Sequence, residues 1–209
     1  MKQVNKLKQL SELPYFDTQS IGQITGLTEQ GLNNTVSRWL RNGLLIQLKR
    51  GRYVTKDYFR SNRSKREYIE FVSNKIRFPS YLSLEYILAS YQILSESVFS
   101  ITAITTKSTR DYTNKLGRFT YRSIQEDLFT GFEIVKKGKF DVAIASKAKA
   151  LFDYLYLKFY RSVRISKKDI EELRLNLDSF DTKEVEEFGQ YCEISNIQKY
   201  KKLPQLLFA

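Results

Sequence analysis

The sequence predicts an α+β protein in two parts, and two observations lead to this fold class. In the first 60 residues, helix-length segments precede two short strand-like runs around a glycine. Beyond them, runs rich in β-branched and aromatic residues give way to amphipathic segments, a pattern typical of a mixed α/β domain with a helical C-terminal tail. We therefore expect one domain at 1–60 and a second at 61–209.

The first 26 residues predict two helices. Apolar side chains recur at three-residue spacing over residues 2–13, and Pro14 follows them as a stop. Asp17 or Thr18 can cap a second, shorter helix that ends near Gly26. Gly26 then predicts a tight turn between the second helix and the third.

A third helix is predicted from the N-cap residue Thr28 to Asn42, with Gly43 just past its end. At 100° per residue, one face is apolar: Leu32, Val36, Trp39 and Leu40. The opposite face is polar and basic without acids: Gln30, Asn34, Ser37, Arg38 and Arg41. Asn and Gln pair with adenine and Arg pairs with guanine, so this face and Thr28 are candidates for base contacts.

Residues 44–54 predict a β-hairpin with a basic tip, formed by Lys49, Arg50 and Arg52 around Gly51. Two helices joined by a glycine turn, a polar-faced helix and a basic hairpin are the order of a winged helix-turn-helix. In that arrangement the last helix enters the major groove and the hairpin, or wing, follows the phosphate backbone. The alternative is a solvated helix face and an ordinary turn.

The charge balance favours a polyanionic partner. The 209 residues contain 35 Lys and Arg against 23 Asp and Glu, a formal net charge of +12. Residues 1–60 hold ten basic and four acidic residues, so half of this excess, +6, lies there. Basic chains gain affinity for nucleic acid by releasing condensed counterions.

Several classes of function are disfavoured by what the sequence lacks. The absence of histidine removes the common nucleophile systems and His-ligated zinc, and the single cysteine, Cys192, leaves no disulfide framework. Residues 1–6 show no apolar signal core, and no apolar run is long enough to span a bilayer. We expect a soluble, cytoplasmic protein without cofactor or metal.

The second domain predicts a helix over 83–91, strands over 98–104, 119–124, 132–135 and 140–145, and a helix over 146–160, with helices beyond residue 166. Residues 105–112 are expected to pair with the strand before them. Residues 60–66 are polar and predict either a linker or the exposed start of a connecting helix that continues through Tyr68, Ile69 and Val72. Few core contacts should cross this segment, so a fragment from about residue 60 onward should fold alone.

A second phosphate-binding patch is a further hypothesis. Arg118 and Arg122 fall on one face of a predicted strand, and Lys107 and Arg110 precede them. A solvated sheet face explains the same residues equally well.

An enzyme is the weaker alternative. A metal-dependent nuclease would use Asp127, Glu133 and Asp141, with Lys136 nearby. Residues three apart on a strand point to opposite faces, so Glu133 and Lys136 are wrongly spaced. Phosphate-loop and dinucleotide-binding glycine patterns are also lacking, and we expect no catalytic residues.

An ordered series of segments resembles the AbiEi family of abortive-infection antitoxins over about residues 10–160. The segments are Tyr81–Tyr91, Val98–Thr102, Thr105–Arg110, Gly117–Arg122, Leu128–Phe132 and Lys149–Leu157. Lys147-Ala148 stands where such proteins often have Pro-Glu, so any role of that acidic side chain is not transferred.

The resemblance implies a bacterial type IV antitoxin. Such a protein represses its own operon at inverted repeats and counteracts a nucleotidyltransferase-like toxin without a stable complex. Under an alternative hypothesis, the second domain neutralises the toxin by direct protein–protein binding, which its Tyr and Phe content permits.

Overall fold

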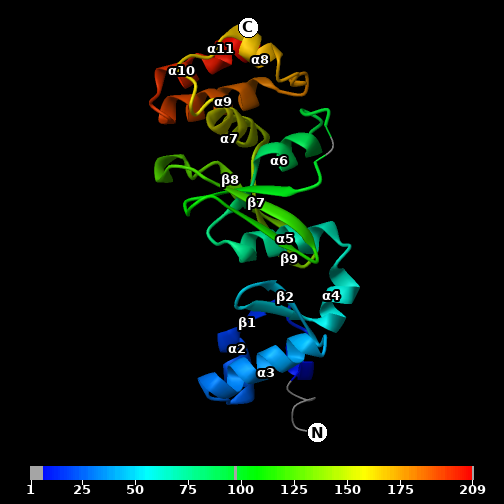
Figure 1. The fold of residues 1–209 in the computed structure, drawn as a ribbon. Helices are drawn as coiled ribbons and strands as arrows, with labels where there is room; N and C mark the ends of the chain where they lie inside the picture. Colours follow the sequence, from blue (N-terminus) through cyan, green and yellow to red (C-terminus); the bar gives the residue numbers. More distant parts are fainter. Residues whose placement is uncertain (1–6, 97, 209) are drawn as a thin grey trace.

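The computed structural model describes residues 7–96 and 98–208, and its elements stack in layers from N-terminal to C-terminal helices (Figure 1). The first elements are β1 (Phe16–Asp17), α2 (Thr18–Thr25), α3 (Glu29–Arg41), β2 (Leu45–Lys49), β3 (Arg52–Thr55) and α4 (Lys56–Asn62). The strands form an antiparallel sheet in the order β1-β3-β2. Of the first helix predicted over 2–13, residues 1–6 lie outside the described residues and residues 7–10 are helical.

Local chemistry explains these boundaries. The Asp17 side chain accepts a hydrogen bond from the Ser20 amide at 2.9 Å and so caps α2. Gly26, Gly43 and Gly51 all have positive φ, which only glycine adopts without strain. They close the turn after α2, the end of α3 and the tip of the hairpin, as the sequence predicts.

The second part contains α5 (Arg66–Ile76), β4 (Tyr81–Leu82), α6 (Leu84–Ser90), β5 (Ile101–Thr105), β6 (Arg110–Asn114), β7 (Gly117–Ser123), the 3-10 turn η1 (Glu126–Leu128), β8 (Phe132–Lys137), β9 (Phe140–Ala145) and α7 (Lys147–Lys158). The six strands form a mixed sheet in the order β6-β7-β5-β4-β9-β8. Helix α5 covers one face, and α6 and α7 lie on the other (Figure 1). The protein is therefore α+β.

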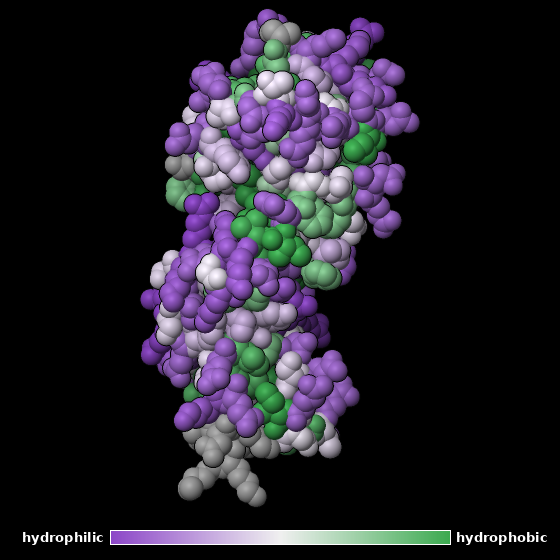
Figure 2. Space-filling view, turned by 180° about the vertical axis from the view of Figure 1, so that it is seen from behind, coloured by the Kyte–Doolittle hydropathy of each residue, from purple (hydrophilic) through white to green (hydrophobic). Residues whose placement is uncertain are grey.

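The C-terminal tail is helical, as predicted, with α8 (Lys167–Glu171), α9 (Thr182–Ile194), α10 (Gln198–Lys201) and α11 (Leu203–Phe208). Capping boxes begin α8 and α9, at Ser166 and Asp181. The tail packs on α7 and away from the N-terminal layers (Figure 1). No helix within 7–96 or 98–208 is long and apolar enough to cross a membrane. On the face seen from behind, most of the surface is hydrophilic and the hydrophobic patches are smaller (Figure 2).

One predicted strand pairing is wrong. Residues 105–112 were expected to pair with the strand before them, but β6 pairs antiparallel with β7, and β7 runs parallel to β5. Gly117, with φ of +132°, allows a short connection from β6 into β7, so the local hairpin forms instead. Strand β7 then lies between β5 and β6.

Of the two alternatives for residues 60–66, the start of a connecting helix is confirmed, since α5 begins at Arg66. The expectation that few core contacts cross this segment is wrong. Residues 60–66 belong mostly to the end of α4 and the start of α5. The core of the second part includes hairpin and α4 side chains: Ile46, Leu48, Val54, Tyr58 and Phe59. Alternate hairpin residues, Leu45 and Tyr53, pack in the N-terminal core with Trp39. Because strand side chains alternate between faces, the hairpin serves both cores.

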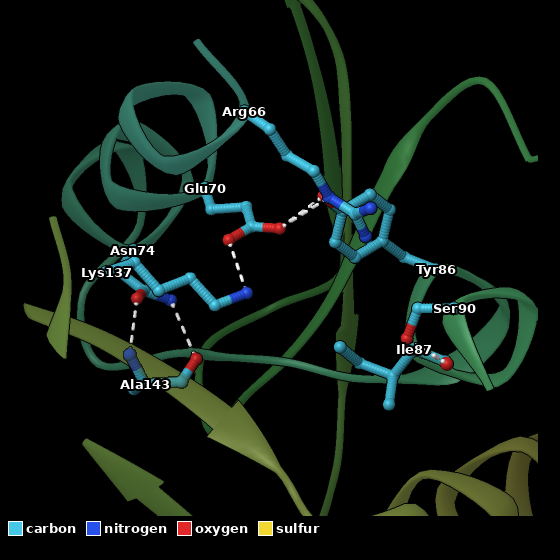
Figure 3. A network of polar contacts seen from close by, with 8 residues as sticks. All are labelled: Arg66, Glu70, Asn74, Tyr86, Ile87, Ser90, Lys137 and Ala143. Atoms are coloured by element: carbon cyan, nitrogen blue, oxygen red, sulfur yellow. Dashed lines mark hydrogen bonds and ion pairs between the residues drawn. The ribbon is translucent and has the colours of Figure 1, made fainter. Parts of the chain in front are cut away.

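A buried carboxylate joins three elements of the second part (Figure 3). Glu70 on α5 is fully buried and accepts hydrogen bonds from Arg66 Nε at 2.9 Å and from the Tyr86 hydroxyl at 2.6 Å. Its other oxygen accepts one from Lys137 Nζ at 2.7 Å. Asn74, one turn further along α5, bonds to the backbone of Ala143. These contacts fix α5 against α6, β8 and β9.

A second buried ion pair lies on α7, where Lys149 Nζ and Asp153 Oδ1 are 2.6 Å apart and both side chains are fully buried. The other Asp153 oxygen accepts hydrogen bonds from Tyr81 and Ser83, and Lys149 also donates to the Leu128 carbonyl. Both charges thus have several partners, as buried charges require. They join α7 to β4, to the start of α6 and to η1.

Candidate nucleic-acid interface

Helix α3 presents a polar face to solvent at the N-terminal end of the molecule. Its apolar residues Leu32, Val36 and Trp39 are buried, and Leu40 is partly buried, as the periodicity predicts. All the predicted base-contacting residues are exposed: Thr28, Gln30, Asn34, Ser37, Arg38 and Arg41. Those on α3 itself fall within one side of the helix.

The Thr28 prediction needs one correction. Thr28 occupies the N-cap position of α3, but its hydroxyl makes no capping hydrogen bond. The residue is exposed, so solvent can satisfy the first amides of the helix. Thr28 therefore lies exposed at the N-terminal end of α3.

The hairpin residues differ in exposure. Arg50 at the tip is exposed, whereas Lys49 and Arg52 are half-buried. The Arg52 guanidinium lies over the Tyr15 ring, 5.5 Å from its centroid, and opposite Asp17 in the strand register. Arg50 is thus the most accessible of the three predicted phosphate contacts.

Five basic side chains from both parts of the chain gather at the hairpin, and we call them the basic cluster. Its members are Lys49, Arg52, Arg77, Lys107 and Arg110. Burial, followed by the positive charges of the other four, lowers the pKa of Lys49 below its usual value. Cations gathered in one place create a positive potential that attracts an anion.

Arg77 is a member that the sequence did not indicate. It lies just after α5, and its guanidinium donates to Tyr112 and to both the hydroxyl and the carbonyl of Ser108. These contacts hold the loop between β5 and β6, which carries Lys107. Because Arg77 is 28 positions from Lys49 in the chain, only the tertiary fold brings the two together.

The predicted second patch is divided by the sheet. Arg110 is paired with Tyr121, whose hydroxyl bonds to Ser73 on α5, so the Arg110 side chain lies on the α5 face of the sheet. The next residue, Asp111, is paired with Thr120 and lies on the opposite face. Arg118 and Arg122 lie on that opposite face too, since each is two residues from Thr120. Lys107 and Arg110 therefore join the basic cluster. The guanidinium groups of Arg118 and Arg122 instead form ion pairs with the Asp111 carboxylate, with nitrogen–oxygen distances of 2.7 and 3.2 Å. The four residues do not form a single patch.

The carboxylates of the enzyme alternative are scattered. Asp127 lies in η1, and Glu133 and Asp141 lie on β8 and β9, where Asp141 is opposite Lys136. Within the part of the chain that the structure describes, no group of three metal-ligating side chains is found. These three carboxylates thus lie at separate, exposed positions.

No protein-family model matches this chain, and no curated protein matches it.

Proposed function

We propose that this protein binds duplex DNA as a winged helix-turn-helix regulator. The observation that supports this most is the position of the acid-free polar face of α3 at the same end as the basic hairpin. Asn34 and Arg38 would read base edges in the major groove, and Arg50 would bind phosphate.

The basic cluster extends the phosphate-binding surface beyond the hairpin. Lys107 lies in the loop between β5 and β6, and Arg110 begins β6, yet both are near enough to Lys49 for their charges to lower its pKa. Together with Arg50 they would neutralise additional phosphates along the backbone. The DNA site would therefore be longer than one that a winged helix alone covers.

Electrophoretic mobility shifts on the region upstream of the protein's own gene test this proposal. We expect a specific complex that survives excess competitor DNA, with protection of inverted repeats. The double variant Asn34→Ala/Arg38→Ala should lose it, while Gln190→Ala, an exposed amide on α9, should not. Equal affinity for all duplexes would contradict base reading.

We further propose that the protein is a type IV antitoxin and autorepressor, on the resemblance to the AbiEi family. Its partner would be a nucleotidyltransferase-like toxin that it counteracts without a stable complex. Co-expression with such a toxin encoded by the neighbouring gene tests this. Asn34→Ala/Arg38→Ala should lose repression of a promoter reporter but keep protection. Failure of the wild-type chain to protect would contradict the antitoxin role, and a toxin retained in a pull-down would favour direct binding.

A further inference from the structure

A cavity of about 850 Å³ lies on the α7 side of the six-stranded sheet. Its walls come from β5 and β7, the start of α6, residues 98–100 and the C-terminal end of α7. The cavity lies where the two helices on this face leave the sheet uncovered, since α6 packs mainly on β5 and α7 on β9. The β7 face is left open there.

Basic side chains dominate the polar lining of this cavity: Arg118, Arg122, Lys158 and Arg161. All four are at least partly exposed. Glu85 is the one carboxylate in the described lining. Asp111 pairs with Arg118 and Arg122 from outside the lining. One carboxylate shared by two guanidinium groups leaves the β7 wall positive.

Aromatic rings lie beside these cations with much of their surface in solvent. Phe99 is 96% exposed and Tyr160 is 61% exposed, and both line the cavity. Phe99 and Arg118 also line a smaller cavity of about 280 Å³ with Arg66 and Tyr86. A phenyl ring this exposed gains little from the fold and offers a flat surface for stacking.

We propose that this cavity binds a nucleotide unit, with its phosphate on the four cations and its base against Phe99 or Tyr160. Guanidinium groups bind phosphate in a bidentate fashion, and bases stack on aromatic side chains regardless of sequence. The volume falls in the range of small-ligand sites, roughly 300–1,000 Å³. Bases in a duplex are already stacked, so the ligand is a free nucleotide or the end of a single strand.

This site is separate from the proposed duplex-binding surface. Arg118 and Arg122 occupy the opposite face of the sheet from Arg110, which belongs to the basic cluster. Duplex binding and nucleotide binding therefore have different residues. Loss of one activity does not imply loss of the other.

Titration calorimetry of the full-length protein tests the proposal with ATP, GTP, CTP and UTP, with a single-stranded RNA octamer and with inorganic tripolyphosphate. We expect saturable binding at one site per chain. Arg122→Gln and Arg161→Gln should each weaken it by about tenfold or more, as expected for loss of a charge-assisted contact. The matched control Arg164→Gln removes an exposed charge outside the lining and should change affinity little.

Phe99→Ala separates a nucleotide from a simple anion. It should weaken nucleotide binding but not tripolyphosphate binding, whereas Ile134→Ala, which also removes an exposed apolar side chain, should affect neither. If the triphosphates bind more tightly than the octamer, the ligand is a free nucleotide. If the octamer binds more tightly, the ligand is the end of a single strand. The proposal is overturned if no nucleotide binds saturably, or if Arg164→Gln loses as much affinity as the cavity variants. It is also overturned if tripolyphosphate binds as tightly as ATP, or if an oligoglutamate peptide competes for the site as well as a nucleotide does.

Discussion

The side-chain amide of Asn114 donates a hydrogen bond to the main-chain carbonyl of Leu48 over 2.8 Å. This bond joins the end of β6 to β2, across 66 positions of the chain. The hairpin is thus bonded to the six-stranded sheet as well as packed on it. The relative placement of Arg50 and Lys107 is therefore set by the fold.

On the proposed function, replacing Asn34 by Ala should weaken specific DNA binding by about 1–3 kcal/mol, since a bidentate base contact would be lost. Arg38→Ala should have a similar effect. Fluorescence anisotropy on the operator and on single-base variants measures both affinity and base preference, with Gln190→Ala as control. If either variant lost affinity equally on every sequence, that residue would not read bases.

Arg50→Gln, Lys107→Gln and Arg110→Gln should each reduce the slope of log K against log salt by about 0.9, the value for one phosphate contact on B-DNA. Their effect should be similar on all DNA sequences. Lys168→Gln, on exposed α8, is the matched control. An unchanged slope for Lys107→Gln and Arg110→Gln would confine the interface to the N-terminal part.

Asp153→Ala should lower the free energy of unfolding by about 3–5 kcal/mol, because it leaves Lys149 charged and buried without its carboxylate. Urea denaturation measures this. The double variant Lys149→Met/Asp153→Leu should lose less free energy of unfolding than the two single replacements lose together. Glu193→Ala breaks a pair with Lys201 in which Glu193 is 64% exposed, and should cost below about 1 kcal/mol. Similar costs for both pairs would show that burial is not decisive.

A fragment of residues 61–209 should be much less stable than the whole chain. It lacks the hairpin and α4 side chains of the shared core, and each large apolar side chain contributes about 1.5–3 kcal/mol when fully buried. The summed contribution of these side chains is comparable with the whole free energy of unfolding of a typical domain, about 5–15 kcal/mol. Size-exclusion chromatography and urea denaturation test this. A monomeric fragment with an unchanged midpoint would contradict it.

The cap of α2 should respond to acid. A backbone hydrogen bond from Ser20 lowers the pKa of Asp17 below its usual value. In the unfolded chain the pKa of an Asp carboxyl is about 3.9. The carboxyl of Asp17 in the folded protein therefore stays ionised to a lower pH than in the unfolded chain. The stability that Asp17 contributes is present above that pH and is lost as the pH falls through the lowered native pKa. NMR titration of its carboxyl should show the shift, and Asp17→Asn should abolish this part of the pH dependence.

Helix α3 could be predicted closely because its caps and its apolar period are local properties of the sequence. The exposed positions of Asn34 and Arg38 follow from the same period. The basic cluster could not be predicted, since only the packing of α5 on the sheet brings the charge of Arg77 near Lys49. The β-branched neighbours of Phe99 predict a strand there, but β5 begins at Ile101 and Phe99 lies outside it, 96% exposed.

The hairpin packed into two cores limits how the protein can be re-engineered. A chimaera that exchanged residues 1–60 for a different N-terminal unit would replace Ile46 and Val54, which belong to the core of the second part. The exchange should instead be confined to α2, the turn and the solvent face of α3. On the proposed function, operator choice would then be altered by replacing exposed residues of one helix, while the hairpin is kept as the wall that both cores share.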